Sequence, residues 1–228
     1  MSGEANPAGT GLCWDAIDTV LLDMDGTLLD LRFDNHFWLE HVPARWGARQ
    51  GLDVSEAKAV LYERMRRVQG TLDWYCLDYW TRELGLDVAA LKHEVADLIR
   101  PLPDARPFLA ELRASGRRIL LVTNAHRAAL RLKLARTGIA EFFDGLISSH
   151  DLGAPKEDAR FWRRLRSLEP FEPDRTLMVD DSLSVLRAAR ACGVAHIRAV
   201  RRPDSGRPAR DTGDFEALES LADLLPVR

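Results

Sequence analysis

The sequence predicts an α/β fold, a Rossmann-like doubly wound parallel sheet with a helical cap inserted after the first strand. Short apolar segments alternate with amphipathic helical segments over most of the chain, which is typical of a parallel sheet covered on both faces. Residues 31–100 interrupt this alternation, because they show helical periodicity and no convincing strand. The interruption predicts an inserted unit.

The predicted elements follow one another in a regular order. The first strand covers residues 17–23, an apolar run with Val and Ile that ends in Asp-Met-Asp-Gly. Further predicted strands share this apolar character and cover residues 118–122, 145–147, 176–179 and 196–200. Predicted helices, each followed by a glycine suited to a left-handed C-terminal cap, cover residues 107–115, 126–137 and 183–192. A polar loop over residues 201–213 and a final helix over residues 215–225 complete the chain.

The interrupting segment contains three predicted helices. Residues 55–69 form one, stopped by Gly70, and residues 72–84 form another, stopped by Gly85. Asp87 is placed to cap a third helix that runs to about residue 99. Prolines then mark the return to the alternating pattern. We therefore predict a core of residues 1–30 and 101–228 and a helical cap of residues 31–100.

Charge and composition exclude several classes of protein. The formal net charge of the 228 residues is -3, which gives no general attraction to nucleic acid or to anionic membranes. The Arg-rich run at residues 163–166 is interpreted as a solvated helix face. No apolar run approaches the length of a membrane span. We expect a small-molecule partner and neither nucleic acid nor a membrane, and no protein partner can be inferred from the sequence.

The cysteines and the N-terminus indicate the compartment. Cys13, Cys76 and Cys192 are far apart in sequence, with no Cys-x-x-Cys and no nearby Cys/His cluster, so neither a disulfide framework nor a zinc site is predicted. Such a sparse set is typical of a reducing compartment. Residues 1–11 are polar, without a basic start or an apolar stretch, and we expect a flexible lead and not a signal peptide. A cytoplasmic location is predicted.

Acidic pairs follow two of the predicted strands. Asp23 and Asp25 end the first strand, and Asp180 and Asp181 follow the strand at residues 176–179. The carboxyl ends of strands in an open α/β sheet form the ligand crevice, and clustered carboxylates need a cation or a shared proton. Oxygen ligands beside a phosphate favour Mg²⁺. Taken singly, each pair is also compatible with an acidic turn or a helix cap.

Two further strand ends carry groups that suit phosphate. Thr123 and Asn124 follow the strand at residues 118–122, and a hydroxyl with free backbone N–H groups binds phosphate oxygens. Lys156 follows Gly-Ala-Pro and offers a positive charge for phosphate and aspartate. Alone, the first pair is equally typical of a turn, and the lysine is typical of a surface charge.

The order of these motifs resembles that of the haloacid-dehalogenase-like phosphatases, over residues 17–193. The resemblance implies that Asp23 is a nucleophile and a metal ligand, and that Asp25 is the general acid/base and gives a backbone carbonyl to the metal. It implies that Thr123, Asn124 and Lys156 bind the phosphoryl group. The implied metal residues are Asp23, Asp25, Asp180 and Asp181, with Mg²⁺ as the cofactor. Relatives often carry a further acid where this chain has Val185, so Asp180 is assigned its place.

Several segments also resemble bacterial GMP/IMP 5′-nucleotidases of this superfamily. They are DTVLLDMDGTLLDL at 18–31, FDNHFW at 33–38, TLDWYCLDYW at 71–80, TNAH at 123–126, PKED at 155–158 and PDSG at 203–206. The resemblance implies a purine nucleoside monophosphate as substrate. Trp74 and Tyr75 are candidate walls for the purine, or part of the cap's own core. Asn35 and His36 are candidate substrate or hinge residues, or simply part of a turn.

Three alternative functions remain compatible with the sequence. A sugar-phosphate or phosphoglycolate phosphatase would keep every core residue and differ in the cap. A haloacid dehalogenase would share the fold but would not need Asp25, because a halide leaves unprotonated. A non-catalytic phosphate-binding protein would typically lack a carboxylate or the lysine, and this chain retains all of them.

Overall fold

The computed structural model describes residues 12–228, and the expectation for residues 1–11 lies outside this part. It contains a six-stranded sheet in the order β3-β2-β1-β4-β5-β6, in which every pairing is parallel. The predicted doubly wound parallel sheet is therefore confirmed. The strands are β1 (Thr19–Leu22), β2 (Arg118–Thr123), β3 (Gly145–Ser148), β4 (Thr176–Asp180), β5 (His196–Val200) and β6 (Ala217–Leu218).

The central strand shows why this sheet is apolar on both faces. All four residues of β1 are buried, and β1 pairs with β2 on one side and β4 on the other. Val20 and Leu22 belong to one hydrophobic cluster, whereas Leu21 belongs to a second. Because successive side chains point to opposite faces, a continuous apolar strand fills two cores.

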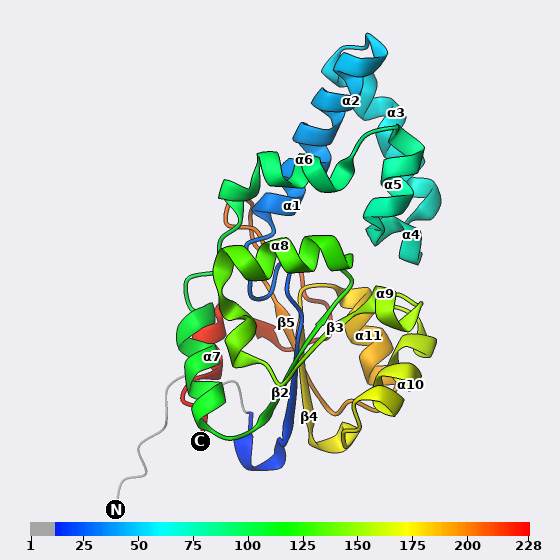
Figure 1. Ribbon diagram of the computed structural model, residues 1–228. Helices are drawn as coiled ribbons and strands as arrows, with labels where there is room; N and C mark the ends of the chain where they lie inside the picture. The colour runs from blue at the N-terminus through cyan, green and yellow to red at the C-terminus, as the bar shows by residue number, and fades with distance from the viewer. Residues whose placement is uncertain (1–11) are drawn as a thin grey trace, which may run out of the picture.

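Helices cover these two faces (Figure 1). The first cluster contains Phe108 and Leu112 of α7, and the second contains Phe161 and Trp162 of α10. The helices of this part of the chain are α7 (Ala105–Ala114), α8 (Arg127–Thr137), α9 (Ser149–Leu152), α10 (Ala159–Leu168) and α11 (Leu183–Ala191). Short 3₁₀-helices join them: η1 (Trp14–Ala16), η4 (Ile139–Phe142), η5 (Pro173–Arg175) and η6 (Leu221–Leu224).

The elements between β1 and α7 along the chain are all helices, and they stack beyond α8 at one end of the molecule (Figure 1). They have a hydrophobic cluster of their own, which includes Trp46, Leu61 and Trp80. Their bounds are α1 (Arg32–His36), the π-helix η2 (Phe37–His41), α2 (Val42–Gln50), α3 (Val54–Val68), α4 (Leu72–Tyr75), α5 (Leu77–Leu84), α6 (Val88–Glu94) and the 3₁₀-helix η3 (Ala96–Leu98). We propose to treat residues 31–100 as a cap domain.

Three sequence predictions of helices need correction. The helix expected over residues 72–84 breaks at Cys76, whose backbone is extended. The helix that begins after Asp87 ends at Glu94 and continues only as η3. The final helix expected over residues 215–225 is wrong, because Leu218 pairs with Val200 as part of β6 and only a 3₁₀ turn follows. Sheet pairing at the edge outweighs the local helical pattern there.

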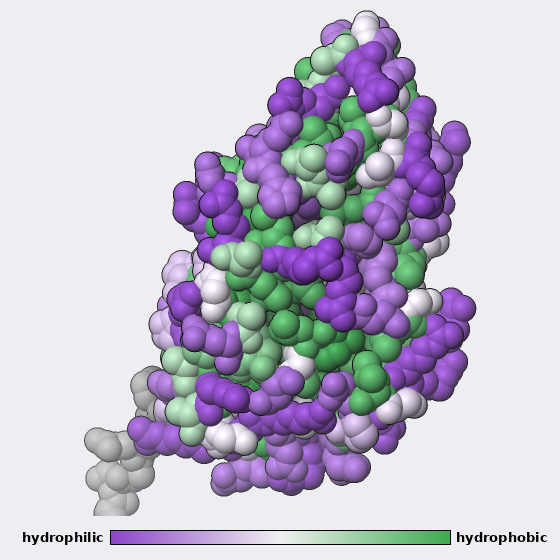
Figure 2. All heavy atoms as spheres, in the orientation of Figure 1, coloured by the Kyte–Doolittle hydropathy of each residue, from purple (hydrophilic) through white to green (hydrophobic). Residues whose placement is uncertain are grey.

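The surface of the molecule is mixed. Hydrophilic residues cover much of the face in Figure 2, while hydrophobic ones gather across its middle. Within residues 12–228, no helix has the length and apolar character that a bilayer crossing requires.

Candidate active site

The carboxyl ends of strands β1, β2 and β4 place the predicted polar residues at one edge of the sheet. Asp23 follows β1 directly, and its backbone N–H donates to Val179 O of β4 at 3.0 Å. Thr123 is the last residue of β2, and Asp180 is the last of β4. Parallel strands bring their carboxyl ends together, so three separate motifs meet in space.

A glycine turn allows the first motif to approach the last one closely. Gly26 has φ +87°, and a Cβ atom built there would lie 2.7 Å from Cγ of Asp181. Any other residue would be strained by the backbone angle and would clash with this carboxylate. The Asp-x-Asp-Gly pattern therefore has a structural reason for its glycine as well as a chemical reason for its acids.

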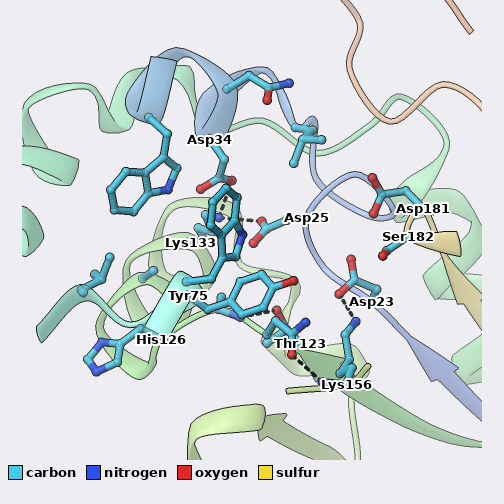
Figure 3. Close-up of a pocket in the computed structure, with 18 of the residues that line it drawn as sticks. Asp23, Asp25, Asp34, Tyr75, Thr123, His126, Lys133, Lys156, Asp181 and Ser182 are labelled. Carbon is cyan, nitrogen blue, oxygen red and sulfur yellow. Dashed lines mark hydrogen bonds and ion pairs between the residues drawn. The ribbon is translucent and has the colours of Figure 1, made fainter. Parts of the chain in front are cut away.

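A cavity of about 330 Å³ opens at this edge of the sheet. The core contributes the predicted residues to its lining, namely Asp23, Asp25, Thr123, Asn124, Lys156, Asp180 and Asp181. The helices between β1 and β2 contribute Asn35, Trp38, Trp74 and Tyr75. Figure 3 shows Tyr75 of the inserted helices close to Asp23 and Thr123 of the core. His36 is absent from this lining, and its ring lies 6.4 Å from that of His41.

Three of the four predicted acids form a compact group. Carboxylate oxygens of Asp23, Asp180 and Asp181 lie within 4.8 Å of one another. Burial raises the pKa of Asp23 to about 7, and also raises the pKa values of Asp180 and Asp181. Their mutual repulsion adds to this effect, as the Asp180 charge does at Asp23. A hard cation with oxygen ligands would stabilise the charged forms together.

Lys156 already neutralises part of this charge. Its Nζ donates to Asp180 Oδ2 at 2.7 Å, to Val122 O at 3.0 Å and to Asp23 Oδ1, and the side chain is buried. Burial alone would lower the pKa of Lys156, but Asp180 and Asp23 outweigh it and raise the pKa above its usual value. The lysine is therefore a fixed positive charge beside Asp23.

Asp25 points away from the acidic group toward a second lysine (Figure 3). Lys133 Nζ donates to Asp25 Oδ1 and to Asp34 Oδ2, both at 2.6 Å, and Lys92 Nζ donates to Asp34 Oδ1 at 3.0 Å. Burial, together with the charges of Asp34 and Asp23, raises the pKa of Asp25 to about 6 despite Lys133. The Asp25 carboxylate is thus separate from the candidate metal group, and the metal contact through its backbone carbonyl stays a prediction.

The buried network around Asp25 was not predicted from the sequence. Lys133 and Lys92 are buried, and Lys92 Nζ lies 4.2 Å from the centroid of the Phe37 ring. A signal exists for Lys133, because it stands four residues from both Ala129 and Thr137 on the inward face of α8. No comparable pattern marks Asp34 as its partner.

The Asn124 side chain braces the site. Its Oδ1 accepts from the backbone N–H of Lys156 at 2.9 Å, and its Nδ2 donates to Glu157 Oε2 at 3.0 Å. Tyr75 Oη donates to the other oxygen of Glu157 at 2.6 Å. Glu157, which was not singled out from the sequence, therefore joins the inserted helices to the core. Thr123 Oγ1 accepts from the Ala125 N–H at 3.0 Å.

The polar loop of residues 201–213 also reaches the site. Arg210 Nη1 lies 3.1 Å from Asp181 Oδ2, and Asn35 Nδ2 donates to the buried Asp204 Oδ2 at 2.6 Å. The sequence marks this stretch as a loop, with PDSG at 203–206 as part of the nucleotidase resemblance, but indicates neither contact. Its contacts tie the cavity rim to the end of β5.

The family model for haloacid dehalogenase-like hydrolases matches residues 17–193. The chain belongs to this family. It is 43% identical over 215 residues to the GMP/IMP nucleotidase YrfG of Escherichia coli (strain K12), covering 94% of this chain and 97% of that protein. It is 26% identical to a phosphoglycolate phosphatase of Pseudomonas syringae pv. tomato (strain ATCC BAA-871 / DC3000), covering 91% and 78% of the two chains.

Solved structures show the same fold. A haloacid dehalogenase-like (HAD) phosphatase from Thermococcus onnurineus superposes with a TM-score of 0.77 at 25% identity, covering 91% of this chain and 96% of that one. The family and these relatives confirm the predicted enzyme class, so this haloacid dehalogenase-like hydrolase is a phosphoric monoester hydrolase.

A Cys/His group that the sequence does not show is present in three dimensions. Cys76 lies beside His126 and His150, although no Cys/His cluster is visible in the sequence. All three cysteines are free, in agreement with the absence of a predicted disulfide framework.

Proposed function

We propose that this hydrolase cleaves phosphate monoesters through an aspartyl-phosphate on Asp23, with Mg²⁺ held by Asp23, Asp180 and Asp181. The observation that carries the proposal is the group of three carboxylates at the cavity floor beside the buried Lys156. Its donors are all oxygen atoms, which fits a hard cation such as Mg²⁺. When bound, Mg²⁺ would lower the repulsion between phosphate and aspartate.

The side chains of the chain itself supply the remaining chemistry. An Asp23 oxygen attacks phosphorus while the bond from phosphorus to the ester oxygen breaks, and Lys156 stabilises the charge on the phosphoryl group. Asp25 protonates the departing oxygen, and it then takes a proton from the water that hydrolyses the acyl phosphate. A pKa of about 6 suits both tasks near neutral pH. Thr123 and neighbouring N–H groups hold phosphate oxygens.

We further propose a purine 5′-monophosphate, GMP or IMP, as the preferred substrate. The 43% identical relative carries this activity in its name, and aromatic side chains line the same cavity as the acids. A volume of about 330 Å³ lies within the range of about 300–1,000 Å³ that is common for small-molecule pockets. Trp74 and Tyr75 are the proposed purine walls, and Asn35 is a rim residue. His36 lies outside the lining and is given no role. The cytoplasmic location stays a prediction.

Phosphate release from a panel of substrates tests both levels of the proposal. The panel contains GMP, IMP, AMP, a pyrimidine nucleotide, ribose 5-phosphate and phosphoglycolate, each with Mg²⁺ and with excess chelator. We expect the highest kcat/KM for GMP or IMP, and loss of all activity with chelator. Full activity in chelator would overturn the mechanism. A clear preference for phosphoglycolate, the substrate in the name of the 26% identical relative, would overturn the nucleotidase assignment alone.

A further inference from the structure

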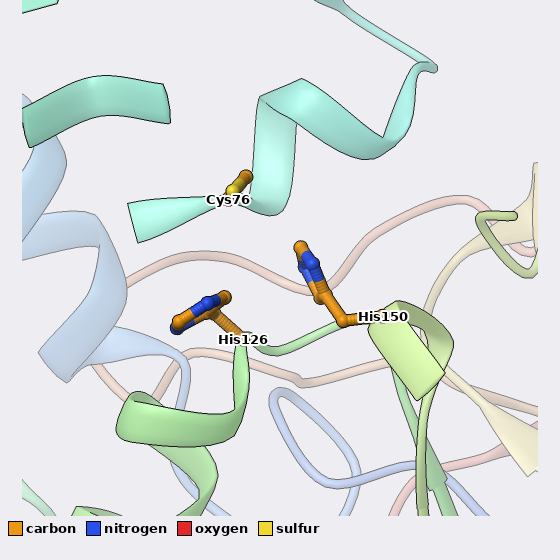
Figure 4. A group of neighbouring side chains, drawn as sticks. All are labelled: Cys76, His126 and His150. Atoms are coloured by element: carbon orange, nitrogen blue, oxygen red, sulfur yellow. The ribbon is translucent and has the colours of Figure 1, made fainter. Parts of the chain in front are cut away.

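A cysteine and two histidines meet at the seam between the inserted helices and the core. Cys76 lies at the break between α4 and α5, His126 precedes α8, and His150 lies in α9 (Figure 4). One ligand atom from each lies within 4.8 Å of the others, and each side chain is partly buried. The rings of His126 and His150 are 4.9 Å apart and nearly perpendicular. Three segments far apart in sequence therefore present ligating atoms to one small volume.

His150 supplies the observation that singles out this cluster. Its Nε2 is buried and makes no hydrogen bond of good geometry within residues 12–228, with the Tyr75 backbone as the polar group beside the ring. A buried polar atom without a partner carries a free-energy cost, and such atoms in native structures are commonly explained by a water or an ion. Here the surrounding donors are a thiol and a second imidazole.

The donor types select one class of cation. One sulfur and two nitrogen ligands suit Zn²⁺ and related transition metals, whereas Mg²⁺ prefers oxygen. Tetrahedral Zn²⁺ places its ligand atoms about 3.3–3.8 Å apart, given Zn–N and Zn–S bonds of about 2.0–2.3 Å. The limit of 4.8 Å in this cluster means that small side-chain rotations close the site.

We propose that Cys76, His126 and His150 bind a borderline transition metal of the Zn²⁺ class, which ties the inserted helices to the core. The exposed Asp78 carboxylate lies 3.6 Å from His126 Nε2 and is placed to complete a tetrahedral set. This site is separate from the acidic group, because its ligands come from other elements and its donor atoms are soft. It also adjoins the purine wall, since Tyr75 is the residue before Cys76.

The existing hydrogen bonds allow the metal to bind at low cost. His126 Nδ1 accepts from the Ala128 N–H at a long 3.3 Å, so coordination through Nε2 requires the proton to move to Nδ1 and gives up a weak bond. Cys76 Sγ accepts from the Tyr79 N–H at 3.4 Å as the N-cap of α5. A thiolate can keep this interaction while it binds a metal.

Cobalt absorption distinguishes this site from the acidic one. The full-length protein is stripped of metal, given excess Mg²⁺ and titrated with Co²⁺. A sulfur-to-cobalt charge-transfer band requires a thiolate ligand, so Co²⁺ at the acidic group produces none. We expect a band that saturates at one equivalent and disappears when Zn²⁺ is added. No band in the wild-type protein would overturn the proposal.

Variants identify the ligands. Cys76→Ser keeps an oxygen that can cap α5 but removes the soft ligand, so the band should vanish. Cys192→Ser, which changes a cysteine outside the cluster, should leave it intact. His150→Gln should weaken Zn²⁺ binding by at least about 10–100-fold, the loss that even an outer-shell partner produces. A band of unchanged intensity in Cys76→Ser, or unchanged Zn²⁺ affinity in His150→Gln, would contradict the assignment.

Thermal melting tests, without the cobalt absorption band, whether a bound metal joins the inserted helices to the core. Zn²⁺ should raise the Tm of the wild-type protein and of Cys192→Ser, and should leave that of Cys76→Ser unchanged, with Mg²⁺ constant throughout. Circular dichroism before melting shows whether each variant is folded. If Cys76→Ser is not folded, His150→Gln is used as the test variant in its place. An equal Tm rise in wild type and His150→Gln would count against a metal bridge.

Discussion

Individual buried charges explain how two neighbouring aspartates can differ in behaviour. Asp23 contacts Lys156 and faces Asp180 and Asp181, whereas Asp25 contacts Lys133 and faces Asp34. The same residue type, two positions apart, therefore has a different lysine as its ion-pair partner. This separation suits one carboxylate to attack and the other to transfer a proton.

The proposed role of Asp25 predicts a dependence on the leaving group. Asp25→Asn cannot donate a proton, so kcat/KM for a nucleotide, whose ribose oxygen leaves poorly, should fall by about 10²–10⁴-fold. An activated aryl phosphate needs little protonation and should lose much less. Steady-state kinetics on both substrates measures the difference. Equal losses would argue against Asp25 as the acid, provided that circular dichroism shows a folded variant.

Lys133 predicts an effect on stability that a surface lysine would not have. In Lys133→Met, the partly buried Asp25 loses its cation, while Asp34 keeps Lys92. Breaking a buried ion pair costs about 3–5 kcal/mol, and the pKa of Asp25 should rise further. We expect a Tm lower by roughly 6–20 °C for a chain of this size.

Matched variants separate this effect from a general loss of packing. Arg131→Met changes an exposed position on the same helix. Its free energy of unfolding should stay within about 0.5 kcal/mol of the wild-type value. Lys133→Met combined with Asp25→Asn removes the unpaired charge and should recover part of the stability. If the double variant is no more stable than Lys133→Met, the charge is not the cause.

At the residue scale, a sequence predicts the site residues that stand at recognisable local positions. Asp23, Thr123, Lys156 and Asp181 stand at strand ends or after a rigid turn, and parallel topology brings them into one cavity. Lys133 and Asp34 have no such marker, because their pairing depends on how α1 and α8 pack. Glu157 has none either, because it pairs with Tyr75 of the inserted helices. Pairing between helices is a tertiary property that one sequence does not display.

At the scale of elements, local signals fail where long-range contacts decide. The break at Cys76 involves neither proline nor glycine, and Trp80 Nε1 donates to Trp74 O across it at 3.0 Å. The edge strand β6 is only two residues long and pairs with β5, which overrides the helical pattern of residues 215–225. By contrast, Asp87 accepts from the Ala90 N–H at 2.9 Å, so the predicted N-cap is confirmed.

The break between α4 and α5 places Trp74 on the cavity, and a substitution there should change substrate choice. Trp74→Ala should lower kcat/KM for GMP or IMP by about tenfold or more relative to a small aryl phosphate, because apolar contacts to one group contribute about 1–3 kcal/mol. Tyr79→Ala is the control, since Tyr79 packs in the same cluster without lining the cavity. Equal losses on both substrates would mean that Trp74 does not contribute to recognition of the base.

For the whole molecule, the sequence predicts the architecture well because its largest signals are periodic. Alternating strands and helices specify the sheet, and the helical stretch after β1 marks the insertion. The exact seam between the two parts was not predictable, since Tyr75–Glu157 and the cluster around Cys76 join residues distant in sequence. Those contacts depend on how the two folded parts pack against each other.

The metal proposal has a consequence for the stability of the whole chain. Burial and repulsion disfavour the charged forms of Asp23, Asp180 and Asp181, so a cation that binds them in the folded state alone should stabilise that state. At a Mg²⁺ concentration 100 times the Kd, mass action contributes about 2.7 kcal/mol. For 228 residues this corresponds to a Tm increase of about 5–11 °C. Thermal melting with Mg²⁺ and with chelator measures it without any substrate. Asp181→Asn should lose most of the increase, whereas Cys76→Ser should keep it, because its sulfur lies outside the acidic group. The same increase in Asp181→Asn would show that Mg²⁺ binds elsewhere.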